Sequence, residues 1–127
     1  MAKKRVRSNY VIGGPYGVPE TNTTFCAVEV PAGSFVPAYG VSVLITTILD
    51  GGTPSMTIGD PTAADGWLTS ANITETTVGA YNSVAGTYSV TGKYYPTAGV
   101  INCALATGLT AGVFYVVAEI LDVTGAI

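Results

Sequence analysis

Carboxylic acids are the side chains in this sequence most able to do chemistry, because two carboxylates at close range can act as general acid and base. Asp50, Asp60 and Asp65 lie in predicted turns, where aspartate also hydrogen-bonds to nearby backbone. Glu29 and Glu119 alternate with apolar residues in predicted strands and are expected to face solvent. The sequence does not show that any two of these acids meet, and we predict no catalytic pair.

The sequence also lacks the residues that other kinds of catalysis and metal or nucleotide binding require. The chain has no histidine, so no side chain has an unperturbed pKa near neutrality and no serine has a histidine partner. The glycine-rich residues 13–17 lack the Lys-Ser/Thr pair of a nucleotide-binding loop. Zinc lacks ligands, and Ala64 stands where a calcium loop over residues 60–66 needs an oxygen ligand. We predict no catalytic residue, no metal site and no cofactor, and therefore no enzyme.

The two cysteines, Cys26 and Cys103, lie 77 positions apart in predicted strands. They can form a disulfide or remain thiols that pack as small apolar side chains, and the sequence leaves both arrangements open. The basic N-terminus is not followed by the apolar region of a signal peptide, and no run reaches the ~18 apolar residues of a membrane span. We expect a protein made in the cytosol without a membrane partner.

Charge is scarce and unevenly distributed. Only 10% of the 127 residues are charged, against about 25% in an average soluble domain, which indicates a surface available to neighbouring proteins. Residues 8–127 hold one base against eight acids, a net charge of −7. This body has no basic face, so we predict no nucleic-acid partner. The four bases before residue 8, here called the basic head, are Lys3, Lys4, Arg5 and Arg7.

A terminal block of like charges is typical of an interaction arm. We predict that the basic head docks on an acidic surface and orders three nearby side chains there; a solvated tail that docks nowhere is the alternative. The three side chains are Tyr10, Ile12 and Tyr16.

Aromatic residues form a second candidate surface in the middle of the chain. Strand alternation would place Tyr88 and Tyr94 on one face, with Trp67 in a preceding loop. Such residues can bind sugars or form a protein interface, and ordinary cross-strand packing is the structural alternative. Trp67, Tyr88 and Tyr94 are therefore candidate interface or sugar-binding residues.

The elements that must position these residues are strands. Thr, Val, Gly and Tyr are abundant and helix-favouring residues are rare. Residues 41–49 are apolar on both faces and predict a central strand, whereas Pro37 predicts an edge or bent strand over residues 34–39. Residues 59–72 are expected to form a loop with one helical turn around residues 62–65. Strands are expected at residues 23–30, 34–39, 41–49, 55–58, 74–78, 87–95, 100–105 and 112–123.

Turn signals about every 8–12 residues indicate an antiparallel β-sandwich or barrel. Residues 1–22 show no strand periodicity and contain Pro15 and Pro19. We predict an all-β chain with two parts: residues 1–22 form an extended basic N-terminal arm, and residues 23–127 form a single antiparallel β-sandwich or jelly-roll-like domain.

Four segments of this sequence resemble small structural proteins of tailed bacteriophages, in particular head decoration (cement) proteins. The likeness spans residues 24–121, with a strand, a Gly-Asp-Pro loop, an aromatic residue and a further strand as its main motif. The segments are residues 28–33, 41–47, 56–68 and 110–119.

The resemblance implies a jelly-roll or sandwich body, a homotrimer, and a place on the outer surface of a phage capsid, assembled in the host cytoplasm. It also implies binding to the major capsid protein, bridging of capsid subunits, and resistance to the pressure of packaged DNA. The alternative is a carbohydrate-binding fibre or tail module of a phage virion that uses Trp67, Tyr88 and Tyr94. A third hypothesis is a cytosolic lattice subunit with no viral connection.

Overall fold

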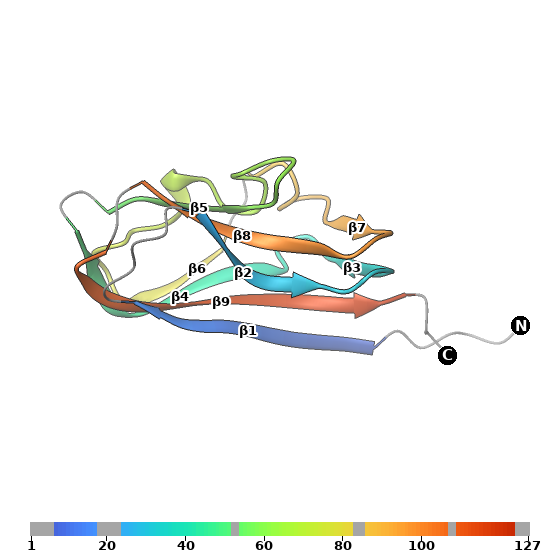
Figure 1. Cartoon of the computed structure of the whole chain (residues 1–127), viewed down its shortest axis with the longest axis horizontal. Coiled ribbons are helices and arrows are strands. Elements are labelled where there is room, and N and C mark those ends of the chain that lie inside the picture. The colour runs from blue at the N-terminus through green and yellow to red at the C-terminus, as the bar shows by residue number, and fades with distance from the viewer. Residues whose placement is uncertain (1–6, 18–23, 52–53, 83–85, 107–108, 124–127) are drawn as a thin grey trace, which may run out of the picture.

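The alternating C-terminal segment organises the fold. A computed structural model describes residues 7–17, 24–51, 54–82, 86–106 and 109–123, and in it this segment forms strand β9, Ala111–Asp122 (Figure 1). Alternate residues of β9, from Phe114 to Ile120, point into the core, and the residues between them are half-buried. This burial pattern follows the period-two geometry of a strand that covers a core with one face.

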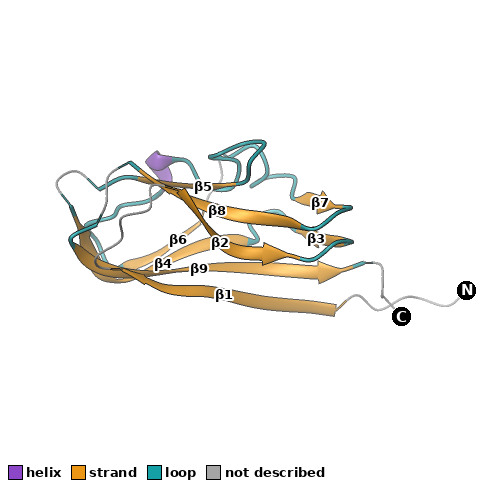
Figure 2. Ribbon diagram, viewed as in Figure 1, coloured by secondary structure: helices purple, strands orange, loops and turns teal. Residues whose placement is uncertain are grey.

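Antiparallel strands make up nearly all the regular structure of the described residues (Figure 2). A single 3-10 turn, η1, spans Ser70–Asn72. The strands are β1 Arg7–Gly17, β2 Thr24–Val30, β3 Ser34–Val36, β4 Val41–Asp50, β5 Met56–Gly59, β6 Gly79–Asn82, β7 Lys93–Tyr95, β8 Gly99–Leu105 and β9 Ala111–Asp122.

Two sheets form the sandwich. The larger has the order β6-β4-β9-β3-β7, with β1 also paired to β9. Because β1 runs beside β9 along the stretches that pair with β3 and β4, those two strands must share the opposite side of β9. The smaller sheet has the order β2-β8-β5. The predicted all-β antiparallel sandwich is confirmed.

The hydrophobic core lies between the two sheets. Phe114 and Ile45 of the larger sheet and Ile58 and Ile101 of the smaller one are fully buried. Trp67 follows β5 and is only 1% exposed, held by backbone hydrogen bonds between residues 67–68 and Ile58. The predicted loop over residues 59–72 therefore lies over one end of the core and contributes its largest side chain.

The strand β1 was not predicted, because glycines and Pro15 hide its periodicity. It pairs with β9 from Arg7 to Gly17, and Figure 1 shows it beside β9 at the border of the sandwich. A Cβ at Gly13 would lie 2.0 Å from the carbonyl oxygen of Ala27 in β2, so only glycine permits the two sheets to approach there. Half of the predicted arm thus belongs to the larger sheet, while residues 1–6 and 18–22 lie outside the described residues.

Of the edge or bent strand predicted over residues 34–39, only residues 34–36 form a strand, and the edge alternative is wrong. β3 has β9 on one side and β7 on the other. The chain then turns over residues 37–40, where the N–H of Gly40 donates to the carbonyl of Pro37 at 2.9 Å. β4 follows on the same side of β9. Its predicted central position is confirmed, because β6 and β9 flank it.

Two other predicted strands are wrong in whole or in part. Residues 74–78 form a turn, in which the carbonyl of Glu75 accepts from the N–H of Leu49 at 2.9 Å. Only the last three residues of 87–95 form a strand, because the N–H of Gly92 closes a turn onto the carbonyl of Tyr88. These tertiary contacts override the strand propensity of threonine and tyrosine. Residues 62–65 form no helical turn; η1 lies further along the same loop.

The two cysteines lie in neighbouring strands of the smaller sheet and form no disulfide with each other. Cys103 is buried and is the register partner of Phe25, while Cys26 is exposed. Among the described residues, no helix has the length and hydrophobicity needed to cross a membrane.

Candidate functional site

Asp60 is the most enclosed acid of the predicted turns. It follows β5, and only 3% of the residue is exposed. Its Oδ1 accepts hydrogen bonds from the N–H groups of Thr62 and Ala63 at 3.0 and 2.9 Å. This is the local turn bonding that aspartate favours, and it fixes the carboxylate at the start of the loop over residues 59–72.

Residues distant in sequence complete the surroundings of Asp60. Lys93 of β7 forms an ion pair with its Oδ2. The hydroxyls of Tyr88 and Tyr95 donate to the same carboxylate at 3.1 and 3.2 Å. The Lys93 ammonium also lies 4.4 Å from the ring centre of Tyr88 and 4.9 Å from that of Tyr95. We call these four residues the Asp60 cluster.

The surroundings of the Asp60 cluster shift the pKa values of Asp60, Lys93 and Tyr95. Burial alone would raise the pKa of Asp60, but hydrogen bonds from Lys93 and the backbone outweigh it, and the pKa is lowered. Burial opposes the charge of Lys93, yet the bond to Asp60 leaves its pKa raised. Burial raises the pKa of Tyr95 to about 12. These shifts keep Asp60 and Lys93 charged and Tyr95 neutral at pH 7, and the cluster acts as a clamp between β5, its following loop and β7.

The remaining acids do not assemble a reactive centre in the described residues. Asp50, Asp65 and Glu29 are exposed, and Glu119 is half-buried on β9. Glu75 is buried, which raises its pKa, and its carboxylate accepts from a backbone N–H. No group of three His, Cys, Asp or Glu side chains in the described part of the chain could hold a metal ion.

The three candidate aromatic residues do not share one surface. Trp67 is buried, and its ring centre lies 5.4 Å from that of Tyr88. Tyr88 lies in a turn instead of a strand and directs its hydroxyl to Asp60. Tyr94 is 48% exposed on β7. Because Trp67 is enclosed, its ring offers no face on which a sugar could stack, and Tyr94 belongs to a different surface.

That surface is the outward side of the larger sheet, here called the outer face. Side chains of directly opposed residues in antiparallel strands point to the same side. Val117 opposes Ile12 on β1 and Ser42 on β4, while Tyr115 opposes Leu44. The register connects further apolar positions across β3 and β7. The apolar side chains of the outer face are Tyr10, Ile12, Phe35, Leu44, Tyr94, Tyr115, Val117 and Leu121.

The outer face is apolar and accessible. Tyr10 is 70% exposed, Ile12 62% and Leu44 37%. Among the described positions of the outer face, Glu119 of β9 is acidic and lies opposite Tyr10 of β1. Exposed apolar patches are common where proteins contact other macromolecules, because water covers such a patch at a cost in free energy.

The structure divides the residues predicted for the docking arm. Tyr10 and Ile12 lie together on the outer face. Tyr16 points inward: its hydroxyl donates to the carbonyl of Ala27 at 2.6 Å, and its ring packs on Phe114. A bulge between Gly13 and Tyr16 inserts one extra residue in β1 and reverses the side to which later residues point.

The structure describes only one of the four charged residues of the arm, and that one by its backbone alone. Lys3, Lys4 and Arg5 lie outside the described residues. The backbone of Arg7 pairs with Asp122 at the start of β1, and its side chain is not among those described. Regular alternation would have indicated Tyr10 and Ile12, but no sequence signal identified the bulge.

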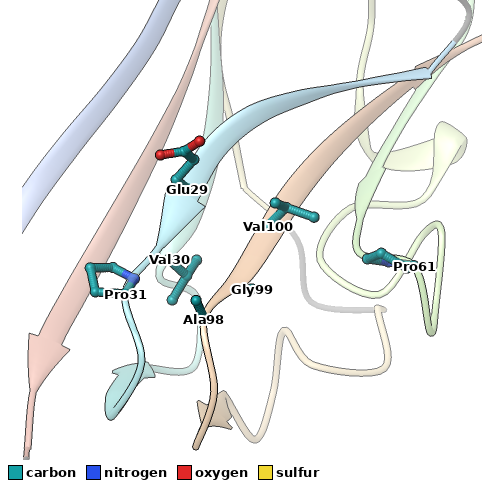
Figure 3. A pocket seen from close by; sticks show the side chains of 7 residues that line it. All are labelled: Glu29, Val30, Pro31, Pro61, Ala98, Gly99 and Val100. Carbon is teal, nitrogen blue, oxygen red and sulfur yellow. The ribbon is translucent and has the colours of Figure 1, made fainter.

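A hollow of about 640 Å³ lies beside the end of the smaller sheet (Figure 3). It has one acid among mainly apolar residues and lacks the convergent polar groups typical of a substrate site. The residues that line it are Glu29, Val30, Pro31, Pro61, Ala98, Gly99 and Val100.

Two solved phage capsid structures contain chains with this fold. A chain of the acidic stable capsid structure of Helicobacter pylori bacteriophage KHP30 is 13% identical, with a TM-score of 0.62 over 98% of this chain and 97% of that one. A chain of the cyanophage Pam1 capsid asymmetric unit is 17% identical, with a TM-score of 0.57 over 93% of this chain and 84% of that one. No protein-family model and no curated protein sequence matches the chain. At these identities the comparisons establish a shared fold.

Proposed function

We propose that this chain is a non-enzymatic structural protein of a phage virion, which decorates the outer capsid surface and bridges capsid subunits. The observation that carries the proposal is the likeness to a chain of a phage capsid structure over 98% of this chain and 97% of that one. A complete counterpart, from β1 to β9, supports a shared role for the whole domain more strongly than a match to one module would.

The outer face supports this proposal independently. It presents Tyr10, Ile12 and Leu44 to solvent with little charge around them. Contact with a neighbouring protein would bury these side chains with little cost for removing charges from water. In an assembly, many equivalent contacts add, so each contact can be weak. We assign the outer face to contact with the major capsid protein and with further copies of the chain, which the phage resemblance leads us to expect as a trimer.

The basic head supplies the second part of the proposal. Lys3, Lys4, Arg5 and Arg7 come shortly before the exposed positions Tyr10 and Ile12 in the sequence. We propose that this end of the chain docks on an acidic capsid surface, with charge giving attraction and the two apolar side chains giving contact area. Tyr16 instead holds β1 to the core.

Co-sedimentation with phage particles produced without the chain tests the proposal. The full chain should bind these particles, and a variant lacking residues 2–6 should bind more weakly. The deletion must end before Arg7, because β1 starts there and belongs to the larger sheet. A matched control, in which Lys3, Lys4 and Arg5 are replaced by glutamine, separates loss of charge from loss of chain length.

Two results would count against the proposal. Full-length protein that stays in the supernatant would overturn capsid binding, and full occupancy by the shortened chain would overturn the role of the head. Binding to glycans without affinity for particles would favour the carbohydrate-binding alternative.

A further inference from the structure

The side of β1 that faces away from β9 is an unpaired strand edge. Among the described residues, β1 pairs with β9 alone. It is 11 residues long, whereas the other border strands β2, β5, β6 and β7 have 7, 4, 4 and 3 residues. Short border strands protect a sheet from further pairing, and a long exposed one invites it. The edge of β1 is therefore the natural place for another strand to add.

One stretch of β1 lacks the features that normally protect such an edge. Residues 9–13 keep an uninterrupted register with β9. They carry no charge, no proline and no bulge; the bulge and Pro15 come only after Gly13. Tyr10 is 70% exposed, Val11 37% and Ile12 62%. Both sides of the strand are thus open to solvent over residues 10–12, while the inner side of Gly13 packs against Ala27 of β2.

We propose that residues 9–13 of β1 pair in antiparallel order with the same residues of a second copy, about a two-fold axis at Val11. This register places Tyr10 of each copy opposite Ile12 of the other, an aromatic and β-branched pair that favours strand association. It sets Asn9 opposite Gly13, so no like charges oppose each other within the stretch. The larger sheets of the two copies become one continuous sheet.

Charge favours a second copy in antiparallel order. All four bases of the basic head precede residue 8, and the rest of the chain has a net charge of −7. Antiparallel pairing sends the two heads to opposite ends of the shared sheet, each toward the acidic body of the other copy. Parallel pairing would bring the heads together and cost energy through repulsion.

A two-fold contact of this kind joins two copies and leaves no further edge of β1 available for a third. The same surface of both copies is used, so the edge is satisfied in one step and does not propagate into a fibre. The outer faces of the two copies become continuous across the new pair. This inference stands without the virion role and departs from the trimer that the phage resemblance implies, because it depends only on the edge, its register and the charge pattern.

A single cysteine placed on the axis provides the first test. In an antiparallel pair centred on residue 11, the two Cα atoms lie about 4.5–5.5 Å apart, within the range that a disulfide bridges. Val11→Cys in a Cys26→Ser background, oxidised with diamide, should give a covalent dimer on a non-reducing gel. The control is Tyr94→Cys in the same background, because Tyr94 is also exposed but lies on β7 at the far border of the sheet. Equal cross-linking of both variants would overturn the register.

The molar mass in solution provides the second test. In light scattering, the double variant Tyr10→Lys, Ile12→Lys should have half the molar mass of the wild type. In this variant, lysines of the two copies would oppose each other across the edge and prevent pairing. Tyr94→Lys should leave the mass unchanged, and circular dichroism should show that both variants remain folded. A wild type that is monomeric or trimeric, or a double variant with undiminished mass, would overturn the proposal.

Discussion

Replacing Asp60 by alanine should lower the free energy of unfolding by about 3 kcal/mol, the lower end of the cost of breaking a buried ion pair from one side. The substitution removes the acceptor for the Lys93 ammonium, for the hydroxyls of Tyr88 and Tyr95, and for two backbone N–H groups. Without the carboxylate, these five donor groups face the apolar methyl group of alanine.

The magnitude depends on which donors can reach water. The Lys93 side chain is 25% exposed and can regain hydration in part. Tyr95 is only 5% exposed, so its hydroxyl loses its acceptor inside the protein, at a cost of about 1–3 kcal/mol. Lys93→Met leaves Asp60 with four donors and should cost less, about 2 kcal/mol.

Urea unfolding followed by tryptophan fluorescence measures these losses. Trp67 is the single tryptophan, is buried, and packs on Tyr88 of the cluster, so its emission reports the unfolding of this region. Asp65→Ala, an exposed position in the same loop, is the matched control and should change stability by less than about 0.5 kcal/mol. If Asp60→Ala proves no more costly than Asp65→Ala, the clamp assigned to the Asp60 cluster is wrong.

Three further outcomes are expected. Gly13→Ala should lower the urea midpoint markedly, because its Cβ would lie 2.0 Å from the carbonyl oxygen of Ala27; an unchanged midpoint would refute the close approach of β1 and β2. Burial raises the pKa of Glu75, so wild-type stability should fall as pH rises from the unfolded pKa through the folded one, and Glu75→Gln should abolish this fall. Burial raises the pKa of Tyr95 from an ordinary value of 10.0 to about 12, so its contribution to stability should be complete below pH 10 and lost toward pH 12. Tyr95→Phe should flatten that part of the pH profile of stability, and an equally steep loss in the variant would contradict this prediction.

Strands with clear alternation were predictable from the sequence. Residues 41–49 and 112–123 were expected as strands, and β4 and β9 occupy Val41–Asp50 and Ala111–Asp122. Each is mostly apolar on the face that points into the core, which is the pattern that a core-facing strand requires. The sandwich followed from the number of such segments and the turns between them.

The remaining elements depend on contacts that no local pattern contains. β1 is a strand because β9 offers a pairing edge and because Gly13 lets the sheets approach. Its bulge turns Tyr16 into the core, although Tyr16 has the same even spacing as Tyr10. Alternation counted along the sequence cannot detect such a shift.

The candidate sites show the same division. The turn at Asp60 was predicted from local bonding preferences. Its partner Lys93 lies 33 positions away, and their meeting depends on how β5 and β7 are placed in the sandwich. The outer face likewise arises only when β1, β3, β4 and β7 are aligned with β9, because β9 supplies three of its apolar residues, β1 two and the other strands one each.

Cryo-electron microscopy of phage particles produced by host cells that carry the gene tests the virion role most directly. We expect density that fits the two-sheet domain on the outer surface of the capsid, with each copy contacting at least two capsid subunits through the outer face or the basic end of β1. Particles that lack this density, or that carry it only on the tail, would contradict the proposed role as a capsid decoration protein.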